Sequence, residues 1–186
     1  READGARRRA EAAATAEAIL AAATPASDGH AYLARKGIKA NGALLHQGKL
    51  IIPMRAGGTL HSVQFIGADG EKRFLIGGRV AGCYFSMGSM KDAAALCIAE
   101  GLATGATVHE ATGHPVAVAF NAGNLLSVAK ALREKYPGLP LILCVDDDYR
   151  TEGNPGLTKA GEAARAVGGL LAVPDFGADR ADGATD

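Results

Sequence analysis

The sequence lacks the features that mark several common classes of protein. Lysine plus arginine equals aspartate plus glutamate, at 20 each, so the net charge gives no sign of a globally basic nucleic-acid binder, and any such contact must come from a local patch. The cysteines form no Cys-x-x-Cys pair, which excludes a zinc ribbon or finger. No apolar run approaches the roughly 20 residues of a membrane span, and the N-terminus has no signal-peptide core. We therefore expect a cytoplasmic protein with no membrane contact.

Few cysteines are present, and two of the three fall inside apolar runs. Cys97 and Cys144 lie in stretches that resemble buried strands, where cysteine usually serves as a small hydrophobic residue. We expect buried, unreactive thiols.

The first half of the chain has the pattern of a small mixed α+β unit. An alanine-rich stretch over residues 1–24 predicts a helix that Pro25 stops. The Arg7, Arg8, Arg9 triplet at its start is either a solvated helix start or a contact for a phosphate backbone. Residues 30–38 predict a short helix closed by Gly37. Residues 49–54, 59–66 and 72–76 predict an antiparallel meander, followed by a strand over 80–85.

After about residue 92, apolar runs alternate with helical stretches, which predicts a parallel sheet with crossover helices. The expected strands are residues 94–99, 115–120, 139–145 and 170–173, and the expected helices are 102–112, 122–136 and 155–167. The fold class is therefore α/β in this half of the chain.

Acidic residues follow two of these strands directly. Glu100 ends the first, and Asp146, Asp147 and Asp148 end the third. In an extended segment Asp146 and Asp148 point to one face and Asp147 to the other, so Glu100, Asp146 and Asp148 can converge at the carboxyl edge of the sheet. Clustered carboxylates are costly unless a cation neutralises them, which predicts a magnesium site. The alternative is that the acids solvate a loop or cap the following helix.

These residues carry a family resemblance. Ile98-Ala99-Glu100-Gly101, followed by Ala103-Thr104 and later by Val145-Asp146-Asp147-Asp148, resembles the Glu-Gly and Asp-x-Asp motifs of Toprim domains. The segment from Asp146 through Lys159 to Ala163-Ala164 resembles bacterial replicative primases, and the insertion over residues 149–155 is most similar to primases of conjugative plasmids and phages. The resemblance implies an N-terminal helix or linker over residues 1–27, a small subdomain with the meander over 28–91, and a Rossmann-like Toprim domain over 92–186.

The resemblance also implies an activity: metal-dependent synthesis of RNA primers from ribonucleoside triphosphates on a single-stranded DNA template. Glu100, Asp146 and Asp148 would hold Mg²⁺ or Mn²⁺, as two ions that activate the attacking hydroxyl and stabilise the leaving pyrophosphate. Glu100 is also a candidate general base. One further acid of the family would be supplied by Asp175, Asp179, Asp182 or Asp186. We expect a catalytic core cut from a longer protein, with a replicative helicase or other domains as partners.

Cationic and polar side chains are candidates for holding a triphosphate or DNA. Arg73 is the first of them, because a forked guanidinium suits phosphate oxygens, although it could instead be a solvated strand edge. Asn121 could reach a nucleotide or merely cap a helix. Tyr84 and Phe85 could stack a base or pack in the core. The nucleotide-binding or DNA-binding candidates are Arg73, Lys72, Arg55, Lys159 and Asn121.

Two other functions use the same residues. A Toprim-type nuclease could employ the three acids for phosphodiester hydrolysis. A noncatalytic module that binds nucleic acid or a protein partner would use them only to shape a loop.

Overall fold

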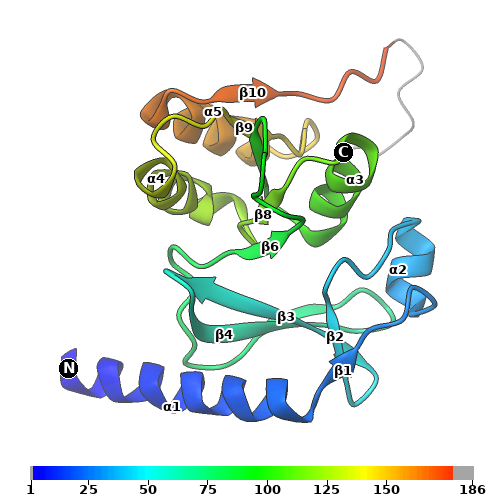
Figure 1. Ribbon diagram of the computed structural model, residues 1–186, viewed down its shortest axis with the longest axis vertical. Coiled ribbons are helices and arrows are strands. Elements are labelled where there is room, and N and C mark those ends of the chain that lie inside the picture. Colours follow the sequence, from blue (N-terminus) through cyan, green and yellow to red (C-terminus); the bar gives the residue numbers. More distant parts are fainter. Residues whose placement is uncertain (1, 178–186) are drawn as a thin grey trace. The chain divides into compact units, whose positions relative to one another are not determined.

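The computed structural model describes residues 2–177, and the chain divides into two compact units, residues 1–85 and residues 86–186 (Figure 1). Each unit has its own sheet. The boundaries expected from the sequence, after residues 27 and 91, remain predictions.

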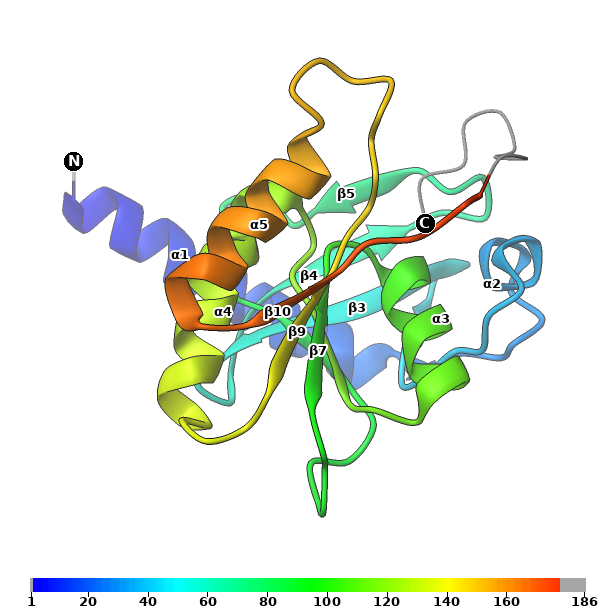
Figure 2. The same cartoon turned by 90° about the horizontal axis from the view of Figure 1, so that it is seen from above.

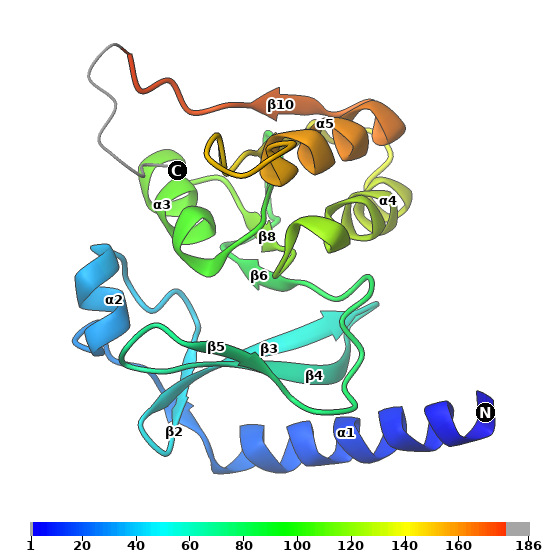
Figure 3. The ribbon, with the colours of Figure 1, turned by 180° about the vertical axis from the view of Figure 1, so that it is seen from behind.

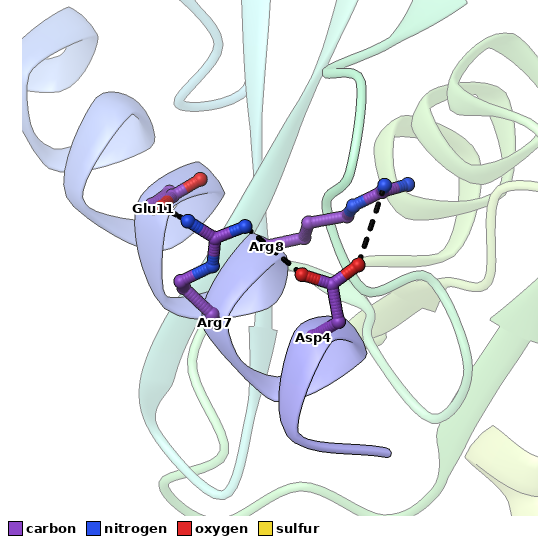
Figure 4. A network of polar contacts seen from close by, with 4 residues as sticks. All are labelled: Asp4, Arg7, Arg8 and Glu11. Carbon is purple, nitrogen blue, oxygen red and sulfur yellow. Dashed lines mark hydrogen bonds and ion pairs between the residues drawn. The ribbon is translucent and has the colours of Figure 1, made fainter. Parts of the chain in front are cut away.

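The first unit begins with α1 (Glu2–Ala22). Alanine favours the helix throughout, and ion pairs between residues three and four apart support its first turns. Arg7 contacts Asp4 at 2.9 Å and Glu11 at 3.9 Å, and Arg8 contacts Asp4 at 3.5 Å (Figure 4). Two arginines of the basic triplet are thus engaged on the solvated helix surface. This arrangement favours the helix-start interpretation of the triplet.

The sheet of the first unit is antiparallel, in the order β1-β2-β3-β4-β5. A short helix, α2 (Ala31–Lys36), lies between its first two strands; His30 caps its start and Gly37, at φ 67°, ends it. The core on the α1 side of the sheet contains Ala16, Ile51, Leu60 and Val63, and α1 lies along β4 in Figure 3. The strands are β1 (Thr24–Pro25), β2 (Leu44–His46), β3 (Lys49–Ala56), β4 (Thr59–Ile66) and β5 (Lys72–Phe74).

The expected meander is confirmed, and two short edge strands, β1 and β2, add to it. The strand expected over residues 80–85 is wrong. That segment forms turns, with one bridge between Arg55 and Tyr84, and β6 (Phe85–Met87) begins only at its end. Apolar residues punctuated by Gly82 resemble a strand in sequence, but at φ 73° this glycine turns the chain out of the extended conformation.

The second unit contains a five-stranded sheet in the order β10-β9-β7-β8-β6. Its central strands run parallel, as the alternating pattern predicted. The remaining strands are β7 (Leu96–Ala99), β8 (Val116–Val118), β9 (Leu141–Cys144) and β10 (Leu170–Ala172). The helices are α3 (Leu102–Thr112), the 3-10 turn η1 (Ala122–Asn124), α4 (Leu125–Lys135) and α5 (Pro155–Val167).

Helices cover both faces of this sheet, with α3 on one face and α4 and α5 on the other (Figure 2). The contact of α3 depends on Gly105, since a Cβ at this position would lie 2.8 Å from Val118 Cγ2 and 3.6 Å from Ala99 Cβ. The helix therefore packs directly against β7 and β8, which holds its first turn beside the ends of these strands.

Between residues 2 and 177, every helix is too short or too polar to cross a bilayer.

Candidate metal centre

Glu100 and Asp146 follow neighbouring strands at the same edge of the sheet. Strands β7 and β9 are parallel partners, with Ala99 opposite Cys144. Glu100 is the next residue after β7, and Asp146 comes two residues after β9. The carboxyl edge of a parallel sheet is where open α/β folds bind ligands. The sequence prediction of two acids at adjacent strand ends is therefore confirmed.

Asp146 is oriented by a residue of α3. The hydroxyl of Thr104 donates a hydrogen bond to Asp146 Oδ1 at 3.0 Å, and Thr104 is buried while the carboxylate is half-buried. A hydrogen bond to a charged acceptor contributes about 1.5–3 kcal/mol. Sequence reasoning did not assign Thr104 a role. The sequence did contain a signal for this role. Thr104 is a hydroxyl residue one helical turn after Glu100, and the other buried residues of α3 are apolar.

Asp147 and Asp148 lie in a loop rather than in an extended segment. Backbone hydrogen bonds from Asp148 N to Asp146 O and from Tyr149 N to Asp147 O curl the chain directly after β9. Strict alternation of side chains therefore does not extend through the three acids. Asp147 has a separate partner, since Asn154 Nδ2 donates to its Oδ1 at 2.5 Å.

Asn154 joins this acidic loop to α5. Its Oδ1 accepts from Leu157 N at 3.5 Å as the N-cap of α5, and its φ of 40° is in the left-handed region, which asparagine tolerates better than most residues. Gly156 completes the junction, because a Cβ there would overlap Asp146 O and lie 3.2 Å from Asp148 Oδ2. The first turn of α5 is thereby held against Asp146 and Asp148.

Two helix N-termini consequently lie next to the acids. Glu100 precedes Gly101, the N-cap of α3, and Asp146 and Asp148 adjoin the start of α5. The positive end of a helix macrodipole stabilises nearby carboxylates. The negative charge of Asp146 also acts on the strand that it follows: the pKa of Cys144, the last residue of β9, is raised, chiefly by its hydrogen bond with Cys97, then by burial, by the charge of Cys97 and by Asp146.

Glu100, Asp146 and Asp148, the three predicted metal ligands, are not gathered into one metal-binding cluster in this structure. Within residues 2–177, no three His, Cys, Asp or Glu side chains are gathered as a group that could hold a metal ion. Glu100 Oε2 is buried, and Asp148 is half-buried. Carboxylate oxygens are the ligands that Mg²⁺ and Mn²⁺ prefer, so the donor chemistry fits such an ion. A shared site for Glu100, Asp146 and Asp148 stays a prediction.

Lys72 and Arg73, two of the predicted nucleotide-binding residues, lie on different faces of the sheet of the first unit. Lys72 pairs with Ile66 and Arg73 with Phe65, and consecutive strand residues point to opposite faces. Lys72 lies 5.9 Å from the ring of Tyr32, whereas Arg73 contacts Glu71 at 2.6 Å. The pKa of Arg73 is raised by this hydrogen-bonded pair. The structure therefore separates two side chains that the sequence places together.

The remaining predicted residues have local partners. Arg55 donates to Gly58 O at 3.3 Å, and Lys159 contacts Glu162 at 2.9 Å. Asn121 Oδ1 accepts from Asn124 N at 3.0 Å, so it caps η1. Phe85 is buried and Tyr84 is half-buried.

The C-terminal acids can be followed only in part. Asp175 is exposed, and its Oδ1 accepts from Gly177 N at 2.9 Å. Asp179, Asp182 and Asp186 lie outside the described residues. Which acid completes the site therefore stays open.

In the parallel sheet, a Glu-Gly pair follows β7 and an Asp-x-Asp motif follows β9, the strand beside it. This arrangement is typical of Toprim domains. Residues 94–173 match the Toprim domain family, and this part of the chain is a Toprim domain. The chain is also similar to two proteins of Escherichia coli, both named DNA primase TraC. The first is 44% identical over 163 aligned residues, and the alignment covers 82% of this chain and 15% of that protein. The second is 44% identical over 156 aligned residues, and the alignment covers 78% of this chain and 11% of that protein.

The chain thus spans under a sixth of the length of either primase, and the similarity extends beyond the Toprim domain into the first unit. The predicted Toprim fold and the resemblance to plasmid primases are confirmed.

Proposed function

We propose that this chain is the catalytic core of a DNA primase, which joins ribonucleotides on a single-stranded DNA template in plasmid or phage replication or transfer. The observation that carries the proposal is the register of β7 and β9, which brings Glu100 and Asp146 to one edge of the Toprim sheet. The 44% identity to two proteins named DNA primase over about four fifths of the chain supports primer synthesis over the nuclease alternative.

Glu100, Asp146 and Asp148 would hold the divalent ions, Mg²⁺ or Mn²⁺, two in number. Held by these carboxylates, the ions would supply activation of the attacking 3′-hydroxyl and neutralisation of charge on the leaving pyrophosphate. The protein side chains then have positioning roles. Thr104 orients Asp146 and Asn154 restrains Asp147, while Glu100, directly before the N-cap of α3, would be the candidate general base.

The remaining candidates would serve the substrates. Arg73, Lys72, Arg55, Lys159 and Asn121 are proposed to contact triphosphate or DNA. A replicative helicase, or further domains of a longer chain, would supply template, and the cytoplasm would be the working compartment.

The test is a priming assay with single-stranded DNA, the four ribonucleoside triphosphates and Mg²⁺ or Mn²⁺. Wild type is compared with Glu100→Gln and Asp146→Asn. Both variants remove a charge from the metal centre, so new oligoribonucleotides should decrease at least about 100-fold. Glu110→Gln is the matched control, because this glutamate is exposed on α3 away from the helix start, and it should prime as wild type does.

Binding of Mn²⁺, followed by electron paramagnetic resonance, gives a readout that needs no template. Weaker Mn²⁺ binding in both variants supports the metal centre. Equal binding by wild type and both variants would contradict it and favour a noncatalytic module. Degraded template in place of new primers would favour the nuclease.

A further inference from the structure

Strand β10 forms an open edge of the Toprim sheet. Within residues 2–177 its only partner strand is β9, which lies on one side of it (Figure 1). Val145 N donates a hydrogen bond to Ala172 O, so the backbone of Ala172 faces β9. Backbone groups of successive strand residues point to opposite sides. The N–H and C=O groups of Leu171, and of Val173 directly after the strand, therefore point outward from the sheet.

This edge has none of the features that usually protect an exposed edge strand. Natural edges carry charged side chains, a bulge or a proline that removes an outward N–H. Residues 166–174, Ala-Val-Gly-Gly-Leu-Leu-Ala-Val-Pro, contain no charge. Pro174 is two residues after Ala172, so its missing N–H belongs to the side of β9 and leaves the outer side unblocked. The outer side can therefore accept another strand.

The side chains of this edge are apolar and exposed. Leu170, Leu171 and Val173 are 62%, 40% and 47% exposed, and they are three of the five large hydrophobic residues that are exposed in the described part of the chain. A hollow of about 610 Å³ adjoins the start of β10. Its walls include Leu139, Pro140, Val167, Gly168 and Leu170. Contiguous exposed apolar surface of this kind marks an interaction site.

Charges of opposite sign flank the apolar segment. Arg165 is exposed in the last turn of α5, before β10, and Asp175 is exposed after β10. A second copy of the same segment that runs antiparallel brings each acidic end to a basic end, which is favourable. A parallel copy would bring like charges together. The charge pattern therefore favours an antiparallel second copy as the partner.

We propose that β10 pairs with β10 of a second copy of this chain, antiparallel about a twofold axis at Ala172. Leu171 of each copy pairs with Val173 of the other, which places their outward N–H and C=O groups in four hydrogen bonds. The same register brings Asp175 of each copy to the start of the other copy's β10, near Arg165. The two five-stranded sheets become one continuous sheet.

The experiment is sedimentation equilibrium of the full 186-residue chain over a series of protein concentrations, in EDTA. The EDTA removes divalent ions that could bridge the Toprim acids of two molecules. We expect a reversible equilibrium between monomer and dimer. Val173→Lys should weaken the dimer about tenfold or more, because both copies bring a charge to the paired edge. The matched control is Ile76→Lys, the same kind of change at a 94% exposed residue of the first unit, and it should leave the dimer unchanged.

A charge exchange tests the antiparallel register. Asp175→Arg and Arg165→Asp each place like charges together and should weaken the dimer about threefold or more. The double variant restores opposite charges and should dimerise as wild type does. All the replaced residues are exposed, and circular dichroism of each variant establishes that the fold is retained.

A chain that sediments as a monomer at every concentration up to about 1 mM would overturn the proposal. So would equal effects of Val173→Lys and Ile76→Lys, or a double variant that dimerises no better than the single variants. The inference does not depend on primase activity, since the measurement uses no template, nucleotide or metal. A failed priming assay would leave the dimer untouched, and loss of the dimer would leave the metal centre untouched.

Discussion

At the residue scale, the hydrogen bond between Thr104 and Asp146 joins the two halves of the candidate metal centre. Thr104 belongs to the helix that follows Glu100, and Asp146 to the loop that follows the neighbouring strand. A hydroxyl that orients a carboxylate limits the positions that the carboxylate can occupy before a metal binds.

Thr104→Val tests this role, because valine has nearly the same shape but cannot donate a hydrogen bond. We expect Mn²⁺ affinity and priming to fall about tenfold, as for other groups that support metal ligands. Thr104→Ser keeps the hydroxyl and should stay within about twofold of wild type. A Thr104→Val protein that binds Mn²⁺ as tightly as wild type would show that Asp146 needs no such support.

The cysteines are buried, as the sequence predicts, and their low reactivity stays a prediction. Cys83, Cys97 and Cys144 are 0%, 2% and 7% exposed. Burial also raises the pKa of Cys83, and only the thiolate reacts readily. The native protein at neutral pH should therefore show no reaction with Ellman's reagent over minutes, and the urea-unfolded protein should show all three thiols. Stoichiometric labelling of the folded protein would contradict the buried placement.

At the scale of elements, the contact of α5 with the acidic loop depends on two small features of its first turn. Asn154 begins the helix from a left-handed conformation, and Gly156 admits the backbone of Asp146. Neither is a candidate ligand. Asn154 and Gly156 nevertheless determine the positions of Asp146 and Asp148.

Gly156→Ala should destabilise the protein by about 1–3 kcal/mol, because the added Cβ meets a backbone oxygen that cannot move without moving the acids. The matched control is Gly161→Ala in the same helix, where a Cβ meets only the flexible end of Arg165 at 3.4 Å. This second change should stabilise the helix by about 0.5–1 kcal/mol. Urea unfolding measures both. Similar effects of the two substitutions would mean that the close approach at Gly156 is not required.

At the scale of the whole molecule, a metal that binds only the folded Toprim domain must stabilise it. At ten times its dissociation constant, such a ligand adds about 1.4 kcal/mol. This corresponds to a rise in Tm of about 3–6 °C for a chain of this size. We expect Mn²⁺ to raise the Tm of wild type measured by scanning calorimetry, and to have little effect on Asp146→Asn. An equal rise in both proteins would place the stabilising ion elsewhere.

The sequence by itself determined the elements of this protein and the positions of its acids along the chain. Two apolar runs end in Glu100 and Asp146, and two helices end at Gly37 and Gly113. These features follow from local periodicity and capping, which depend on individual residues and can be read from the sequence. The strand expected over residues 80–85 failed because a glycine turn and a short strand have similar local composition.

Only the tertiary structure decided which side chains meet. Thr104 reaches Asp146 across 42 positions of sequence, and Gly156 is required only because a distant carbonyl lies against it. Lys72 lies 5.9 Å from the ring of Tyr32, a residue 40 positions earlier in the chain. Such contacts depend on strand order and register, which arise from the packing of the whole sheet and leave no trace in the spacing of nearby residues.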